Sequence, residues 1–252
     1  DVVPAGSGWD TPPYKPVVSC GYILGRGASD NKGPTVAALY AMRCLREQGV
    51  QLKHGIQLYL GCNEEAGMSD IHYFTSHEPQ PVFCLVPDVS FPVCCGEKGT
   101  LTADLVCNIS GSNLIEFSGG IASNSVPDAA HAVLSGFSSD TVQVLAENCN
   151  GIICRQEGPH LRIDASGIAG HAAFPEGTES AIQKLAAFLS YNHLATGPAA
   201  SAISFLADAF SDAYGKGLDI DFSDDISGKT THIGGMVHLE NNHLVQNINV
   251  RY

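Results

Sequence analysis

A chain of 252 residues is long enough for one large domain or two ordinary ones, and its hydrophobic content of 44% provides for a core. The formal net charge of −13 argues against nucleic acid and anionic membrane surfaces as partners, because both favour a basic protein. No apolar stretch of the sequence is long enough to span a membrane.

The nine cysteines are irregularly spaced, and none form the CxxC pairs of a structural zinc site. Cys84 lies within an apolar segment, so we expect mostly buried free thiols and a cytoplasmic location, where thiols stay reduced. The chain begins at Asp1 without a methionine and ends at Tyr252 within a strand-like pattern. We therefore expect an internal fragment of a longer protein.

The first hundred residues alternate helical and strand-like patterns, which indicates a layered α/β unit with parallel strands. Proline at a first helical position and glycine after the last turn are typical helix boundaries. The expected elements are a strand or hairpin at 17–24, a helix from Pro34 to about Gly49, a half-buried strand at 56–60, a helix at 69–77 and a buried strand at 82–86.

After about residue 98 strands and helices mix as in an α+β domain, so we place a domain boundary in the segment 96–100. The expected elements are a strand at 100–110, a helix from Pro127 to Leu134, a strand or helix at 141–147, a strand at 161–166, a helix at 179–190 and strands at 231–237 and 244–250.

Four acidic residues lie where apolar segments stop: Asp30, Glu64, Glu65 and Asp88. In an open α/β sheet the carboxyl ends of the strands form the ligand-binding edge, so these side chains should converge. Converging carboxylates repel one another, and a pair of divalent cations would remove that repulsion. The pattern predicts most of a two-metal site. Taken singly, each acid could instead be a helix cap or a loop carboxylate.

Four motifs occur together and in order: 1–9 (DVVPAG…GW), 25–34 (GRG…DNKGP), 63–65 (NEE) and 87–88 (PD). In this combination the chain resembles the co-catalytic di-zinc peptidase family of bacterial dipeptidase V, carnosinase, aminoacylase and succinyl-diaminopimelate desuccinylase. The resemblance covers essentially the whole chain and is closest to the dipeptidase V branch. It implies an α/β fold: a partial catalytic domain with a parallel-rich sheet over 1–98, then a partial α+β lid domain over 99–252.

The resemblance also assigns roles to the acidic residues. It implies two zinc ions, with manganese or cobalt as alternatives, bridged by Asp30 and bound separately by Glu65 and Asp88. Glu64 would be the general base that takes a proton from water, and Asp1 would orient a histidine ligand two residues upstream. Both histidine ligands of the family would lie outside these 252 residues.

Three residues of the second domain match substrate-binding positions of the family. Asn124 would lie near the scissile group, His171 would polarise the scissile carbonyl, and Arg251 would bind the substrate carboxylate. Alternatively, Asn124 caps a helix that opens at Pro127, His171 is a loop residue and Arg251 is a solvated strand residue. We expect surface positions for the other histidines near the last strands, His232, His238 and His243.

The leading hypothesis is a zinc-dependent dipeptidase, whose partner is a small peptide with a free carboxylate. An amidohydrolase acting on N-acyl amino acids would use the same machinery, and a non-catalytic fragment or binding module is the alternative from another class. The sequence determines neither the side-chain preference nor the oligomeric state.

Overall fold

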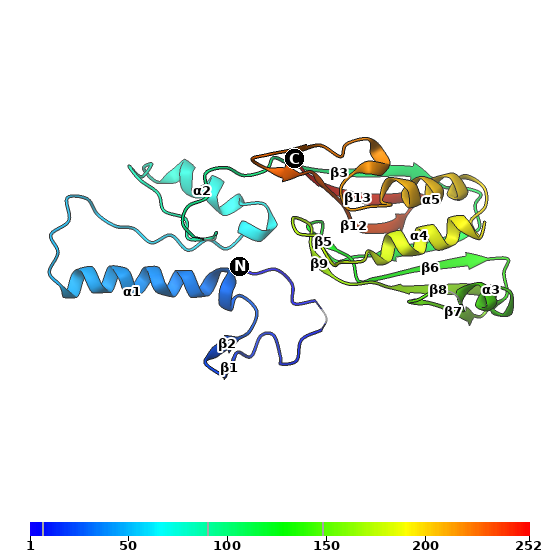
Figure 1. Ribbon diagram of the computed structural model, residues 1–252, viewed down its shortest axis with the longest axis horizontal. Coiled ribbons are helices and arrows are strands. Elements are labelled where there is room, and N and C mark those ends of the chain that lie inside the picture. Colours follow the sequence, from blue (N-terminus) through cyan, green and yellow to red (C-terminus); the bar gives the residue numbers. More distant parts are fainter. Residues whose placement is uncertain (7, 90, 148) are drawn as a thin grey trace. The chain divides into compact units, whose positions relative to one another are not determined.

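The structure, a computed structural model, describes residues 1–6, 8–89, 91–147 and 149–252. The chain forms two compact units, Asp1–Cys95 and Gly96–Tyr252, and the division falls at the start of a glycine-containing segment (Figure 1). Among the described residues, no helix is both long and apolar enough to cross a bilayer.

The first unit contains a hairpin, two helices and two short helical turns. These elements are β1 (Val17–Ser19), β2 (Tyr22–Leu24), η1 (Ala28–Lys32), α1 (Gly33–Glu47), η2 (Glu64–Ala66) and α2 (Ser69–His77). Pro34 lies in the first turn of α1, and Gly49 follows the helix with a left-handed φ of 66°. The hairpin and both helices confirm the sequence-based expectation.

The strands expected at 56–60 and 82–86 are not formed. Within the described part of the first unit, strand pairing joins only β1 to β2, and the side chains of Leu60 and Phe83 are exposed. A strand is stable only when neighbours take up its backbone hydrogen bonds, and neither segment has one here. The mixed α/β class is confirmed, but the parallel-rich sheet predicted for this unit is wrong.

The expectation of buried thiols is wrong for the same reason. Cys84 lies in the unpaired segment 82–86 and is exposed, as are most of the other cysteines. Among the described cysteines only Cys154, in the second unit, is buried, and burial raises the pKa of its thiol to about 11.

The second unit is built on a seven-stranded sheet with the order β3-β13-β12-β4-β6-β8-β7, in which all neighbours are antiparallel. Its strands are β3 (Thr100–Asn108), β4 (Leu114–Gly119), β6 (Ala129–Ser135), β7 (Ile152–Glu157), β8 (His160–Ser166), β12 (Thr231–Glu240) and β13 (His243–Arg251). Two further pairs are β5 (Ser125–Val126) with β9 (Gly170–His171), and β10 (Ser223–Asp224) with β11 (Gly228–Lys229). The helices are α3 (Ser139–Ala146), α4 (Ala181–Tyr191), α5 (Pro198–Ala209) and the short turn η3 (Lys216–Leu218).

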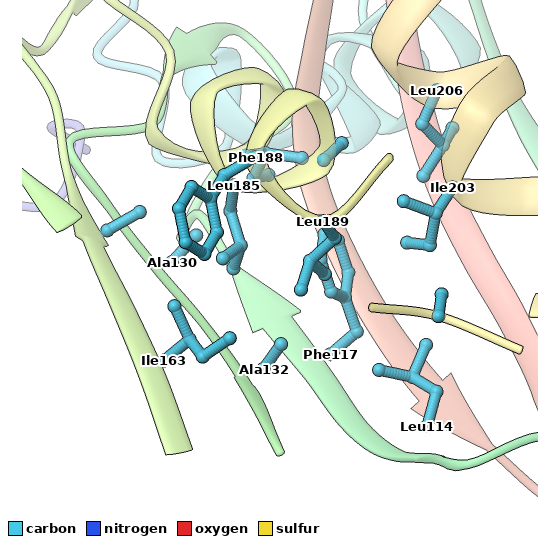
Figure 2. Packing of buried hydrophobic residues seen from close by; sticks show 14 of the residues in the cluster. Leu114, Phe117, Ala130, Ala132, Ile163, Leu185, Phe188, Leu189, Ile203 and Leu206 are labelled. Carbon is cyan, nitrogen blue, oxygen red and sulfur yellow. The ribbon is translucent and has the colours of Figure 1, made fainter. Parts of the chain in front are cut away.

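The core of the second unit lies between the sheet and the helices α4 and α5. Alternate residues of each strand point to this face, where they meet the apolar side of α4. Figure 2 shows Phe117, Ala132, Ile163, Leu185 and Leu189 packed together, all of them buried. Ser180 caps α4 by accepting a hydrogen bond from the Gln183 N–H at 3.3 Å.

The helix expected from Pro127 to Leu134 is instead the strand β6. A short apolar run cannot be assigned to helix or strand by periodicity alone, and the pairing partners decide. β6 pairs with β4 on one side and β8 on the other, so its backbone hydrogen bonds are satisfied within the sheet. Ala130, Ala132 and Leu134 then face the core on alternate positions.

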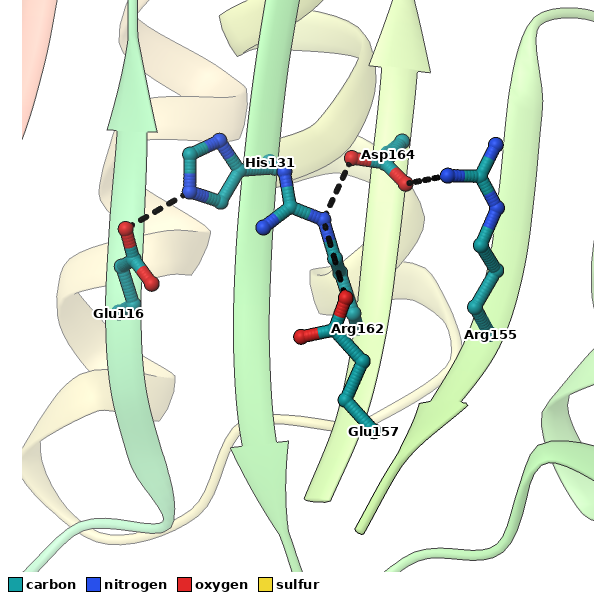
Figure 3. Close-up of polar contacts among 6 residues, drawn as sticks. All are labelled: Glu116, His131, Arg155, Glu157, Arg162 and Asp164. Atoms are coloured by element: carbon teal, nitrogen blue, oxygen red, sulfur yellow. Dashed lines mark hydrogen bonds and ion pairs between the residues drawn. The ribbon is translucent and has the colours of Figure 1, made fainter.

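Charged side chains form ion pairs on β4, β6, β7 and β8 (Figure 3). His131 contacts Glu116 at 2.8 Å, and Arg162 contacts Asp164 at 2.9 Å. Arg155 approaches Asp164 at 3.5 Å. These charges compensate one another, so this surface offers a ligand little net charge.

His232 is buried, contrary to the surface position expected for it. Its ring stacks on Phe210 with a centroid distance of 4.6 Å, and neither ring nitrogen has a hydrogen-bond partner among the described residues. Burial lowers the pKa of His232, and the charge of Asp212 opposes this only in part. The ring is therefore held neutral in the folded state.

We predict that His232 makes the protein less stable as the pH falls. Its folded-state pKa is below 6.5, so the unfolded chain binds the proton first. The free energy of unfolding should decrease as pH falls through about 6.5, by at most about 1.4 kcal/mol per pH unit, and level off below the folded pKa. His232→Phe keeps the stack on Phe210 and should remove this part of the slope in urea unfolding between pH 7.5 and 5.5. The control is His238→Phe, at an exposed position. Equal slopes in wild type and His232→Phe would contradict this prediction.

Candidate functional site

In the first unit the charges of Asp30 and Asp88 act on both glutamates of the 64–65 pair. The pKa of Glu64 is raised by partial burial and, to a smaller extent, by the charges of Asp88, Asp30 and Asp70. The pKa of Glu65 is raised by partial burial, by the charges of Asp30 and Glu64, and by a hydrogen bond with Asp30. Carboxylates affect each other in this way only at close range.

The loop that carries Asp30 is held by the beginning of the chain. Gly27 has a left-handed φ of 80°, and a Cβ there would lie 2.6 Å from Val2 Cγ1. The Arg26 guanidinium donates hydrogen bonds to the carbonyls of Pro4 and Ala5 at 3.2 and 3.1 Å. Asp30 follows in an extended conformation, and the Asp30–Asn31 peptide is cis.

Asn31 is a site residue to which sequence reasoning assigned no role. Its amide nitrogen donates to Asp88 Oδ1 at 2.6 Å and to the Pro87 carbonyl at 3.2 Å. This side chain therefore ties the Asp88 segment to the loop of Asp30. The signal in the sequence was its position directly after Asp30, in a motif already recognised.

Glu64 and Glu65 open the short turn η2. Gly67 and Met68 follow with left-handed φ values of 110° and 58°, which turn the chain into α2. Asp1 lies beside this segment, since its backbone nitrogen is 3.5 Å from the Gly61 carbonyl oxygen.

The donor chemistry of this cluster fits a divalent cation. Carboxylate oxygens bind zinc, manganese and related ions, and a cation would offset the repulsion that, after burial, raises the pKa values of the two glutamates. In the part of the chain that the structure describes, however, no three His, Cys, Asp or Glu side chains are arranged to hold a metal ion. The cluster supplies ligands of the right kind without a formed coordination geometry.

In the second unit, Asn124 and His171 lie side by side. The strands β5 and β9 pair with Ser125 opposite His171, and the Ala172 N–H donates to the Asn124 carbonyl at 2.9 Å. The His171 Nδ1 accepts a hydrogen bond from the Ala173 N–H at 3.2 Å. No helix opens at Pro127, which removes helix capping as an explanation of Asn124.

A bulge in β12 supports the loop that carries Asn124. The register of β12 against β13 shifts between Ile233 and Met236, where two glycines lie. A Cβ on Gly235 would lie 2.5 Å from the Ser123 carbonyl oxygen and 2.7 Å from that of Ala122. Only glycine allows these two backbones to approach so closely.

Arg251 lies at the end of β13, opposite Thr231 of β12. It is partly exposed, and its Nε donates to Asn249 Oδ1 at 3.3 Å. Thr231 and Gly235 are four residues apart on β12, or about 13 Å along a strand. Figure 1 shows β5, β9 and the end of β13 at the same end of the second unit.

The sequence model of "Peptidase family M20/M25/M40" matches residues 1–232. This match covers well over half of the chain, so the chain belongs to that family, as the motifs indicated.

Its relatives are named as dipeptidases. The chain is 31% identical to "Putative dipeptidase YtjP" of Bacillus subtilis (strain 168), over all of this chain and 57% of the relative. It is 33% identical to "Beta-Ala-Xaa dipeptidase" of Lactobacillus delbrueckii subsp. lactis, over 90% of this chain and 51% of the relative. The chain is 32% identical to "Putative dipeptidase SAR1836" of Staphylococcus aureus (strain MRSA252), over 100% of this chain and 57% of the relative. The chain thus spans about half the length of the curated relatives it matches.

We predict that Gly235→Ala displaces the loop at 122–124 while α4 stays intact. The added methyl group would meet backbone carbonyls, which cannot rotate away as a side chain can. Amide hydrogen exchange should accelerate at 122–126 and remain unchanged in α4. Gly96→Ala is the control, because its Cβ would meet no atom within 4 Å. Unchanged exchange at 122–126 in Gly235→Ala would show that β12 does not hold this loop.

Proposed function

We propose that the intact protein is a metal-dependent dipeptidase that uses two divalent cations, with zinc as the first choice and manganese or cobalt as alternatives. The observation that supports this proposal is that the charges of Asp30 and Asp88 act on both Glu64 and Glu65 in the first unit. Membership of a peptidase family and the dipeptidase names of the relatives support it.

Asp30 would bridge the two cations, while Glu65 would bind one and Asp88 the other. Asn31 would fix the orientation of Asp88 through the hydrogen bond at 2.6 Å. Asp1 would orient a histidine ligand that precedes it. When bound, the cations supply positive charge that polarises the peptide carbonyl and lowers the pKa of water.

Glu64 would transfer the protons of the reaction. Adjacent residues on a short turn point in different directions, so Glu65 can face a cation while Glu64 faces the attacking water. Glu64 accepts a proton from that water as the oxygen attacks the carbonyl carbon. It then donates the proton to the departing amine, which restores its carboxylate.

The second unit would bind the substrate. Asn124 directly precedes β5 and lies beside His171 of β9, and both side chains can direct donors to the carbonyl oxygen as it becomes negative. Arg251 would bind the free carboxylate of a dipeptide through charge-assisted hydrogen bonds. A substrate that carries both a peptide bond and a free carboxylate would use all three residues.

A substrate screen of the intact protein tests this proposal. Dipeptides should be hydrolysed faster than N-acetyl and N-succinyl amino acids, and a chelator should abolish turnover until zinc is restored. Faster hydrolysis of the N-acyl substrates would favour an amidohydrolase, and no hydrolysis of either class would refute a catalytic role.

We also propose a cytoplasmic location. Seven of the nine cysteines are exposed, which fits a protein in a reducing compartment. The charge of −13 supports a peptide substrate in preference to a nucleic acid partner.

We predict that Glu64→Gln retains bound metal and lowers kcat by about 10²–10⁴-fold, because the substitution removes the proton acceptor and leaves the proposed ligands in place. Metal content by plasma mass spectrometry and dipeptide turnover on the same samples check this. Glu78→Gln, an exposed change at the end of α2, is the control. If Glu64→Gln instead lost metal but kept a normal turnover rate per bound metal ion, Glu64 would be a metal ligand and not the proton acceptor.

We predict that Arg251→Ala raises KM for free dipeptides by about 10–100-fold, the equivalent of the 1.5–3 kcal/mol of a charged hydrogen bond. Dipeptide amides, which carry no carboxylate, should be affected far less. Arg155→Ala, which removes an arginine bound to Asp164 of the same sheet, should leave KM unchanged for both free dipeptides and dipeptide amides. Equal losses on both substrate types would contradict carboxylate binding by Arg251.

A further inference from the structure

Asp70 bonds to the backbone just before the Glu64–Glu65 turn. Its Oδ2 accepts hydrogen bonds from the N–H groups of Cys62 and Asn63, at 2.5 and 3.0 Å. Its Oδ1 accepts the N–H of Ile71 at 2.9 Å, which fixes the carboxylate at the start of α2. One side chain thus holds both residues that precede Glu64.

Asn63 makes the reciprocal connection. Its Oδ1 accepts hydrogen bonds from the backbone N–H and the hydroxyl of Ser69, at 3.1 and 2.6 Å. Ser69 is the first residue of α2, so Asn63 satisfies the first backbone N–H of a helix that begins six residues later. We call the side chains of Asn63, Ser69 and Asp70, with the backbone of 62 and 63, the turn clamp.

The turn clamp encloses the residues that carry the proposed chemistry. The Met68 N–H donates to the Asn63 carbonyl at 2.8 Å, and the Ala66 N–H donates to it at 3.2 Å. Both ends of the segment 63–69 are therefore fixed. Glu64 and Glu65 lie between them, so their backbone positions depend on the clamp.

Gly61 makes room for the clamp. A Cβ at this position would lie 2.8 Å from Asp70 Oδ2, closer than a real contact allows. The carboxylate can occupy its place against the Cys62 and Asn63 amides only because residue 61 has no side chain.

The backbone amides also set Asp70 apart from the other acids. Desolvation acts to raise the pKa of Asp70, but the hydrogen bonds from Cys62, Asn63 and Ile71 outweigh it and lower the pKa. Glu64 and Glu65 shift in the opposite direction. Asp70 is thus an ionised acceptor committed to the backbone, which distinguishes it from the proposed metal ligands.

We propose that Asp70 is a positioning residue for the reaction, which acts by holding the turn that carries Glu64 and Glu65. This inference rests on the proposed dipeptidase function. Asp70 works through the amides of Cys62 and Asn63, without contact to substrate or cation. Loss of the clamp should move the proton acceptor and a metal ligand together.

Two variants of the intact protein remove the clamp in different ways. Asp70→Asn replaces an acceptor oxygen by a donor that opposes the amides, and Gly61→Ala pushes the carboxylate away. Glu78→Gln changes an acid at the other end of α2, and Gly55→Ala adds a methyl group that meets no atom within 4 Å. Gly61→Ala keeps the test valid if Asp70→Asn does not fold.

The first measurement is amide hydrogen exchange at 61–66, which does not depend on activity. Exchange at these amides should accelerate in both clamp variants and in neither control. Unchanged exchange in both clamp variants would overturn the clamp itself.

The second measurement is dipeptide kinetics at saturating zinc. The clamp variants should lose about 10–100-fold in kcat with little change in KM, because supporting residues typically cost this much and Arg251 is untouched. Zinc affinity should fall as well, since Glu65 moves with Glu64. Accelerated exchange with normal kcat would overturn the positioning role. An inactive wild type would instead overturn the proposed function, while the exchange result would still decide whether the clamp exists.

Discussion

The arrangement of Asp30, Glu64, Glu65 and Asp88 is the constraint on which the proposed site in the first unit depends. Partial burial raises the pKa values of the two glutamates, and the negative charges of Asp30 and Asp88 add to the shift. Hydrogen bonds hold the chain around them: Asn31 donates to Asp88, and Asp70 of the turn clamp accepts from the backbone of 62 and 63, just before the glutamates. An arrangement that opposes its own electrostatics is typical of a functional site, and a pair of cations would offset the repulsion.

The second unit is held together by buried apolar side chains rather than by charged groups. Its seven-stranded sheet packs against α4 and α5, and this core fixes the strands from which the proposed substrate residues project. The bulge at Gly235 supports the loop of Asn124, while β5 and β9 hold His171 beside it. Loops on a packed sheet can present donors with little freedom of movement, which binding of a small substrate requires.

The sequence predicted those elements whose signals are local. Pro34 and Gly49 mark α1, and the turn near 240–242 marks the hairpin of β12 and β13. Prediction failed where pairing partners decide: the segments 56–60 and 82–86 lack a neighbouring strand, and β6 has two. Burial of His232 and the contact from Asn31 to Asp88 depend on residues distant in sequence, and the helix α5 was not predicted. The proposed roles of the acidic residues rest on their order along the chain, and the parallel sheet expected to gather them is not formed.

The central claim is that these carboxylates form a site for two cations. The most direct test is to measure how many zinc ions the intact protein binds. Equilibrium dialysis followed by metal analysis should find two zinc ions per wild-type chain. Asp30→Asn should lose most of the binding of both ions, because the proposed bridge contacts each of them, whereas Asp10→Asn, at an exposed loop position, should retain two. A wild type that binds no zinc, or an Asp30→Asn variant that binds two ions with unchanged affinity, would contradict the account.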